Sequence, residues 1–331
     1  MHAHHYRPRY FLVYVTLFGA FFLCAHAAPA QAANELFYVD RSFDASSRER
    51  IAATELFTGI HARFFVEDEF VAPLNSVGRQ QLTAALQDLS DTFDTKIYPR
   101  LTRTFGMEWK PGIDGDYKIT VLFTQMRNGA GGYFRTEDEF LQSEISSSNQ
   151  REIIYLNSNI VAKFHAKEFL AHEFQHLINY NQKNRTWNKA DEVWLNELMS
   201  EIAPWVAGLY EGEDFVFEKS NFRDRVQTFM SASSDALLDW PNRTEDYGIA
   251  AIFSYYLYER YGDAFFTAIS LSSQTGVAAV EEALASVGEQ KSFREVFQDW
   301  MVAVLVNNCS VPPGNLYCFK SPYLQFRSSN S

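Results

Sequence analysis

The spacing of apolar residues divides the chain into a first part rich in strands and a second part made of helices. Residues 76–97 carry leucines and aromatic residues at helical spacing, and Pro99 should end that helix because proline cannot continue the hydrogen-bond ladder of a helix interior. A glycine-rich loop at 127–134 leads into an expected edge strand. Further short runs typical of β-strands lie at residues 35–40, 62–68, 117–123 and 151–157.

From about Val161 onward, the apolar period becomes helical. Strands followed by helices predict an α+β fold. We expect two lobes, residues 33–185 and 186–331, which meet near the helix that contains residue 172; no linker-like segment separates them. The helices are predicted at about residues 161–180, 192–203, 247–262 (closed by Gly262) and 292–308, the last opened by a capping box of Ser292 and Glu295.

Residues 1–32 have the pattern of a secretory signal peptide. Two arginines come first, 15 apolar residues follow at 10–24, and small residues offer cleavage after Ala27 or Ala32. The apolar run is shorter than the roughly 20 residues of a membrane-spanning helix. The pattern predicts a secreted or periplasmic protein with no stable membrane span after cleavage. The alternatives are an uncleaved anchor and a lipoprotein at Cys24, where the preceding Leu23 is large for such a cleavage site.

Charge and cysteine content narrow the classes of partner. The formal net charge is −12, and loss of residues 1–32 with their two arginines would make it −14. Without a basic cluster, this acidic chain is not expected to bind nucleic acid or anionic membranes. Cys309 and Cys318 would remain, and an oxidising compartment would pair them in a disulfide. The Asp114-Gly115-Asp116 turn could offer oxygen ligands to Ca²⁺, although a solvated turn is the commoner explanation.

The segment AHEFQHLINY at residues 171–180 contains the pattern His-Glu-x-x-His. Residues four apart lie one above the other on a helix, so His172 and His176 would project their imidazoles from one face toward one metal ion. Glu173 lies beside that face, where its carboxylate could reach a water on the metal without being a ligand. A chance match is the alternative, but most chance matches would lack the helical context and a nearby acidic helix.

A catalytic zinc normally has three protein ligands, so the pattern requires a third. The next predicted helix offers Glu197, with 20 residues between it and His176. Glu201 lies one turn beyond Glu197 and could accept the second ring N–H of a ligand histidine; it is also the main competitor for the ligand role. His165, seven residues before His172, is expected to be exposed or close to the site without being a ligand.

These residues resemble those of the glutamate-zincins, and the wider pattern resembles the hyicolysin-type neutral zinc metallopeptidases of bacteria. The resemblance implies a zincin-like fold, with an N-terminal sheet lobe carrying the metal-binding helix and a mainly helical C-terminal lobe. It also implies one catalytic Zn²⁺ held by His172, His176 and Glu197, with Glu173 as general base. Leu198 departs from the pattern, since relatives commonly have glycine there, and a leucine could narrow the groove. The similar segments, in order between about residues 131 and 303, are GGYF, EIIYLN, AHEFQHLIN, WLNELMSEIA, YGIAAIFSYYLYERYG and FREVFQDWMVA.

The chemistry expected of such a site is hydrolysis of peptide bonds in protein or peptide substrates. Zinc would make its water more acidic and polarise the scissile carbonyl, and Glu173 would pass the proton to the leaving amine. A donor to the developing oxyanion is also required, and Tyr247 is the candidate, although a core or surface tyrosine is the commoner explanation. Residues 131–134 could bind substrate backbone by strand addition.

The predicted function is therefore a secreted zinc metallopeptidase, most simply an endopeptidase. One alternative is a catalytically inactive binding or adhesion protein on the same scaffold. The other is a zinc hydrolase that acts on a non-peptide bond.

Overall fold

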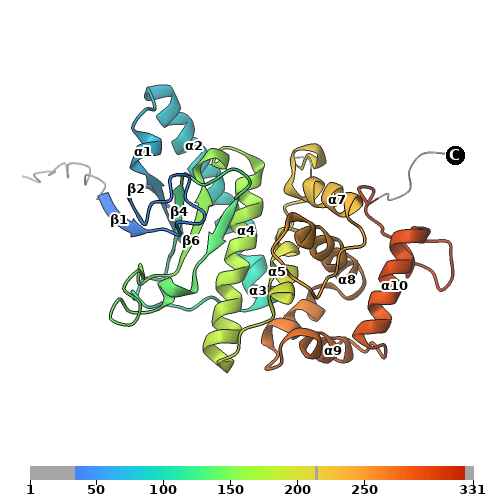
Figure 1. Cartoon of the computed structure of the whole chain (residues 1–331). Coiled ribbons are helices and arrows are strands. Elements are labelled where there is room, and N and C mark those ends of the chain that lie inside the picture. The colour runs from blue at the N-terminus through green and yellow to red at the C-terminus, as the bar shows by residue number, and fades with distance from the viewer. Residues whose placement is uncertain (1–33, 213–214, 325–331) are drawn as a thin grey trace, which may run out of the picture. The chain divides into compact units, whose positions relative to one another are not determined.

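A mixed β-sheet followed by helices makes up the residues that the computed structural model describes, 34–212 and 215–324 (Figure 1). The expected signal peptide at residues 1–32 lies outside the described residues. The sheet has six strands in the order β1-β2-β3-β4-β6-β5. The strands are β1 (Asn34–Tyr38), β2 (Arg50–Thr58), β3 (Ala62–Glu67), β4 (Ile119–Thr124), β5 (Gly132–Phe134) and β6 (Ile153–Asn157).

The centre of the sheet is parallel and its edges are antiparallel. Strands β3, β4 and β6 pair in parallel, and every residue of β4 and β6 is buried. Such strands read as continuous apolar runs because both of their faces are covered. The short strand β5 pairs antiparallel with β6 at the edge of the sheet, so the expected edge strand is confirmed. Strand β2 was not predicted, because RIAATELFT mixes small and charged residues.

Helices dominate from residue 164 onward, which confirms the α+β class with a mainly helical C-terminal part. The boundary between lobes at residue 185 stays a prediction. The helices are α1 (Asp68–Val71), α2 (Ser76–Thr92), α3 (Tyr98–Phe105), α4 (Phe164–Asn179), α5 (Val193–Glu201), α6 (Ala203–Val206), α7 (Asn221–Ser231), α8 (Thr244–Leu271), α9 (Gly276–Ser286) and α10 (Phe293–Val306).

At two predicted helix ends, Pro99 and Gly262, the chain continues as a helix beyond the predicted end. Pro99 does not end the first long helix: α2 continues through a π-helical turn, Phe93–Ile97, into α3, where Pro99 lies in the first turn. A wider π turn before the proline replaces the regular i→i−4 contact that a proline cannot make. Gly262 has a left-handed φ of 61° and breaks α8 as predicted, but the chain resumes a helix as far as Leu271.

Two expected features of the C-terminal part are present. Ser292 and Glu295 form the capping box that opens α10, each side chain bonded to the other residue's backbone N–H. Cys309 and Cys318 are joined by a disulfide with a Cα–Cα distance of 5.1 Å. Among the described residues, no helix combines the length and the apolar character needed to cross a membrane.

Helix α4 lies between the sheet and the C-terminal helices (Figure 1). Its apolar residues Leu170, Phe174 and Ile178 are fully buried in one apolar core that extends from the sheet to α5, α8 and α10. The Phe174 ring packs edge-on against Phe93 with centroids 5.0 Å apart. This packing fixes α4 along its length, and its other face is therefore free to present polar side chains.

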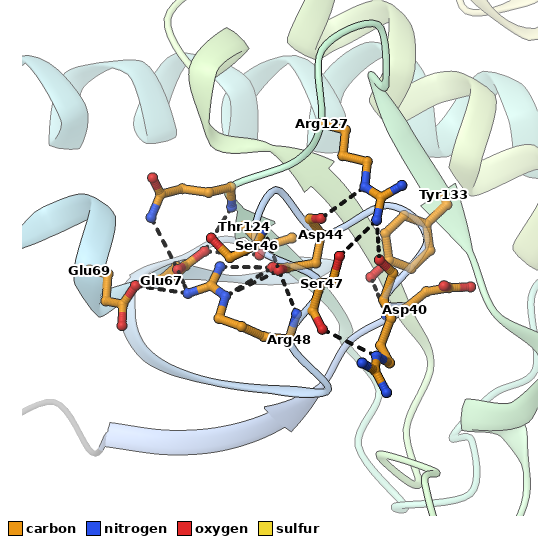
Figure 2. A network of polar contacts seen from close by, with 12 residues as sticks. Asp40, Asp44, Ser46, Ser47, Arg48, Glu67, Glu69, Thr124, Arg127 and Tyr133 are labelled. Atoms are coloured by element: carbon orange, nitrogen blue, oxygen red, sulfur yellow. Dashed lines mark hydrogen bonds and ion pairs between the residues drawn. The ribbon is translucent and has the colours of Figure 1, made fainter.

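A polar network anchors the segment 40–48 beside the sheet (Figure 2). The guanidinium of Arg48 donates to the buried carboxylates of Asp44, at 2.8 Å, and Glu67. Glu67 also accepts a hydrogen bond of 2.9 Å from the hydroxyl of Thr124 in β4. At the other end of the segment, the backbone N–H of Asp40 donates to the Tyr133 hydroxyl of β5 at 3.1 Å. The segment 40–48 therefore extends from β3, which Arg48 contacts, to the edge strand β5, which Asp40 contacts.

Glu168 connects α4 with α7. Its buried carboxylate accepts hydrogen bonds from the Tyr210 hydroxyl at 2.7 Å and from the backbone N–H of Asn221, the first residue of α7, at 2.8 Å. The four N-terminal N–H groups of a helix have no partner within the helix, so an acceptor there is stabilising. Burial nevertheless raises the pKa of Glu168 to about 7, against these hydrogen bonds.

We expect Glu168 to make the protein less stable as the pH rises. Its pKa is about 7 in the folded chain and 4.5 in an ordinary environment, so the folded state binds more protons between those values. The free energy of unfolding should therefore fall from pH 5 to pH 7, by on the order of 2 kcal/mol from this group. Glu168→Gln does not titrate and should lose that part of the slope. Urea unfolding of both proteins at pH 5 and pH 7 measures this change. An equal change in the free energy of unfolding between the two pH values for the original protein and Glu168→Gln would contradict the assignment.

Candidate active site

Helices α4 and α5 bring His172, His176 and Glu197 together. The Nε2 atoms of the two histidines are 3.2 Å apart, and Oε2 of Glu197 lies 3.3 Å from Nε2 of His172 and 3.6 Å from Nε2 of His176. These three form a group whose ligand atoms all lie within 4.8 Å of one another. The two residues of the motif and the acid of the following helix are therefore close enough to share one ion.

The dimensions of the group fit a zinc ion. Zinc–nitrogen and zinc–oxygen bonds are about 2.0–2.2 Å long, so neighbouring ligands of a tetrahedral site are about 3.3 Å apart. The distances of 3.2, 3.3 and 3.6 Å agree with that value. Oε2 of Glu197 is also buried and has no hydrogen-bond partner among the described residues. Two imidazole nitrogens and one carboxylate oxygen are a ligand set that zinc prefers.

Other side chains hold the outer nitrogen of each histidine. Nδ1 of His172 faces Oε1 of Glu201 at 3.6 Å. Nδ1 of His176 lies 3.2 Å from Oδ1 of Asn196 and 3.0 Å from Oγ of Ser200. Such contacts orient the rings so that both Nε2 atoms point to the shared position. Glu201 lies near the ring nitrogen of His172 that it was predicted to bind, and its role stays a prediction. Asn196 and Ser200 were not predicted, although both lie one residue from an acid of the same helix.

Glu201 is itself paired with an arginine whose side chain is only 13% exposed. Nε of Arg225 donates to both oxygens of Glu201 at 3.0 Å, and its Nη2 donates to Oε1 at 2.7 Å. Arg225 belongs to α7, a helix that the sequence did not predict. Its guanidinium also lies 4.8 Å from the centre of the Tyr247 ring. Arg225 therefore connects Glu201, which faces Nδ1 of His172, with Tyr247 in the wall of the cleft.

The carboxylates make the site attractive to positive charge. Burial opposes a charge on His176, but Glu197 and Glu173 outweigh that effect and raise the pKa of His176 to about 9. Burial likewise opposes ionisation of Glu197, yet the two imidazoles hold its pKa well below the usual range. A metal cation in this position would take the place of the proton on His176 and would be attracted by the carboxylates of Glu173 and Glu197.

Glu173 lies under the edge strand. It is 4% exposed, and burial raises its pKa above the ordinary value, with only partial compensation by His172 and His176. A Cβ on Gly132 of β5 would lie 3.0 Å from both Cγ and Oε1 of Glu173 and 2.8 Å from a backbone oxygen of β6. Glycine at this position therefore permits the strand to pass directly beside the carboxylate.

A cleft of about 900 Å³ is lined by His172, His176 and Glu197 together with Glu173. Residues 129–137, which include β5, form one wall, and α7 with the start of α8 contributes to another. Tyr247 lines the cleft and donates to Oδ1 of Asn242 at 3.0 Å. Burial, with added repulsion from Glu197, raises the pKa of Tyr247, so its hydroxyl remains a donor at neutral pH.

Two sequence-based expectations have clear outcomes in this region. His165 is not part of the ligand group; its Nε2 lies 3.9 Å from Asp224, and its side chain is partly exposed. The possibility that Leu198 narrows the groove is not supported, because its side chain is fully buried in the apolar core and is not among the residues that line the cleft. Leu198 points away from the cleft because it follows Glu197 by one residue, about 100° around the helix.

The comparisons with known proteins agree with this chemistry. No protein-family model matches the chain. The neutral metalloprotease ShpI of Staphylococcus hyicus is 24% identical over 287 residues, which cover 78% of this chain and 60% of that protein. The chain therefore spans about 60% of the length of the curated relative that it matches. It is a distant homologue of a neutral metalloprotease.

We expect replacement of Arg225 to be costly because it leaves a buried carboxylate unpaired. Arg225→Met should lower the free energy of unfolding by about 3–5 kcal/mol, and Glu201→Gln in the same chain should recover part of the loss. Arg223→Met, on the same helix, breaks only the exposed pairs with Glu218 and Asp224 and should cost about 0–1 kcal/mol. Urea unfolding of the four proteins, each with its zinc content recorded, measures these differences. Equal losses for both arginines would contradict the buried pair.

Proposed function

We propose that the protein is a zinc-dependent peptidase and, more specifically, an endopeptidase of the hyicolysin type. The observation that carries the proposal is the convergence of His172, His176 and Glu197 on one position beside Glu173, inside a cleft bordered by an edge strand. The distant similarity to a neutral metalloprotease supports the same reaction class. A zinc ion in this position would supply Lewis-acid polarisation of a carbonyl and a more acidic water.

The residues of the chain supply the proton transfers. Glu173 accepts a proton from the attacking water and delivers it to the nitrogen of the leaving amine. Its raised pKa suits this role, because a stronger base accepts the proton more readily and the resulting acid can still give it up. Glu201 and the pair Asn196 and Ser200 keep the two imidazoles in the orientation that directs their Nε2 atoms inward.

The edge strand is the feature that favours a peptide substrate. On the side away from β6, β5 has no neighbouring strand among the described residues, so its backbone groups can pair with an extended peptide. A peptide added there would run beside Glu173, because Gly132 brings the strand within contact distance of that carboxylate. We infer that residues 131–134 hold the substrate backbone.

We further propose that the enzyme works outside the cytoplasm, as a secreted or periplasmic protein. The disulfide between Cys309 and Cys318 supports an oxidising compartment, since such bonds are rare in the cytosol. This proposal also rests on the signal-like pattern of residues 1–32.

Replacement of Glu173 tests the proposed function directly. Glu173→Gln keeps the size of the side chain but removes the base, so cleavage of a denatured protein should fall by about 10²–10⁴-fold while one zinc per chain remains bound. Peptidase assays and metal analysis of the same samples measure both quantities.

The control is Glu218→Gln, a change of the same kind at an exposed position, which should keep full activity. Removal of the metal from the original protein with a chelator should abolish cleavage, and added Zn²⁺ should restore it. A folded, zinc-loaded original protein that cleaves no peptide bond would contradict a peptidase and favour a binding protein on the same scaffold.

Tyr247 is proposed as the donor to the developing oxyanion. Tyr247→Phe retains the ring under Arg225 but removes the hydroxyl, so kcat should fall by about 10²–10³-fold with little change in KM. Steady-state kinetics on a fluorogenic peptide would measure both constants. A rise in KM at unchanged kcat would instead assign Tyr247 to substrate binding.

A further inference from the structure

Two carboxyl groups lie together outside the cleft, in the connection between β5 and β6. Glu139 ends the 3₁₀ turn Thr136–Glu139 that follows β5, and Glu152 directly precedes β6. Glu139 is 4% exposed and Glu152 is 3% exposed. Neither residue lines the cleft, and neither has a role in the proposed peptidase reaction.

Glu139 forms no ion pair with a described residue, although the more distant charge of Arg185 favours its ionised form. Both of its carboxylate oxygens are buried without a hydrogen-bond donor among the described residues. The backbone N–H of Arg151 donates to the carbonyl oxygen of Asp138 at 3.0 Å, which brings the neighbouring residues Glu152 and Glu139 close together. Burial is the main cause of the raised pKa of Glu139, and the carboxyl of Glu152 raises it further. A buried, ionised carboxylate is costly unless it is paired, so this arrangement requires a proton or a cation.

The backbone of the loop 106–118 encloses Glu152. The N–H of Ile113 donates to Oε1 of Glu152 at 3.0 Å. Gly112 has a left-handed φ of 86°, and a Cβ there would overlap the Glu152 carboxylate, which leaves no room for any other residue. The loop therefore holds this carboxylate in place.

A third acid, Asp114 of the loop 106–118, adds to the negative charge around the two glutamates. Asp114 contributes to the raised pKa of Glu152, after the larger effect of burial. Among the described residues, no lysine, arginine or histidine forms an ion pair with Asp114, Glu139 or Glu152. Asp116, the other acid of the turn, is already paired with Arg63 at 2.8 Å. Asp114 does not form a close three-residue ligand group with the two glutamates, so it stands beyond them.

The geometry points to a second cation site, in which Glu139 and Glu152 are the direct ligands of a hard divalent cation such as Ca²⁺. Calcium accepts six to eight oxygen ligands and commonly combines a few carboxylates with backbone carbonyls and water. One dication would balance the two facing carboxylates, and Asp114 would add attraction from further away. Zinc prefers nitrogen and sulfur donors in protein sites, so an all-oxygen pair distinguishes this position from the one at His172 and His176.

Such a cation would stabilise one side of the cleft. It would connect the β5–β6 connection, residues 135–152, with the loop 106–118, which are far apart in the sequence. Because Glu139 follows β5 by only five residues, the ion would help to fix the strand that passes beside Glu173. The inference does not depend on peptidase activity.

Calcium binding can be measured on the zinc-loaded full chain after weakly bound cations are removed by a chelating resin and the zinc content is checked. Added Ca²⁺ should raise Tm by roughly 5 °C at about 100-fold excess over Kd. Tb³⁺, a calcium substitute, should luminesce on aromatic excitation through Tyr180, whose pKa is raised by burial and by Glu139, and Ca²⁺ should displace it.

Glu139→Gln and Glu152→Gln should each abolish the Tm rise and the displaceable Tb³⁺ signal without loss of zinc. Glu144→Gln, in the same connection but exposed, should keep both. Two variants are used so that poor folding of one leaves the other informative. An unchanged Tm with Ca²⁺, together with a higher Tm of Glu139→Gln in its absence, would overturn the proposal and indicate that the two carboxyls share a proton. Loss of cleavage in Glu173→Gln with an unchanged calcium response would separate the two sites.

Discussion

The burial of five ionisable side chains between α4 and α5 is the constraint on which the rest of the structure depends. Two imidazoles and three carboxylates lie close together at the cleft, His172, Glu173 and Glu201 buried and the other two partly buried, and each has to be balanced by an opposite charge or a hydrogen bond. Arg225 balances Glu201, and the imidazoles face Glu197 with a geometry suited to one more cation. The remaining acid, Glu173, lies under the edge strand with a raised pKa. The chemistry of the site follows from this arrangement of charges.

The packing around α4 explains how such a region can be held in place. The apolar face of the helix is buried in a core shared by the sheet and the later helices, so the polar face has a fixed orientation. Helix α7 is attached to α4 through Glu168 and presents Arg225 to Glu201. On the opposite wall, a polar network holds residues 40–48 against β5 (Figure 2). Both walls of the cleft are therefore fixed by buried polar contacts as well as by apolar packing.

The sequence predicted the parts of the site that lie on helices with regularly spaced apolar residues. His172 and His176 share a face because of their four-residue spacing, and Glu197 lies on a helix whose apolar residues Trp194, Leu195, Leu198 and Met199 make it recognisable. Arg225 could not be found in this way, because the apolar positions of α7, NFRDRVQTFMS, are interrupted by charged and polar ones. The burial of Leu198 depends on which side of α5 faces the core, and Pro99 is accommodated by a π turn; both result from tertiary packing, which local patterns do not encode.

The position of the first three strands limits how the chain can be shortened. Strands β1, β2 and β3 make up half of the six-stranded sheet, and β3 is the parallel neighbour of β4 in its buried centre. A protease that cut after residue 67 and released this piece would uncover the apolar surface of β4 and remove the support of residues 40–48 from β5. We therefore expect these strands to stay in the active protein, unlike an inhibitory pro-region that can leave once folding is complete. A cut that removes an N-terminal piece and preserves all six strands would have to fall before Asn34.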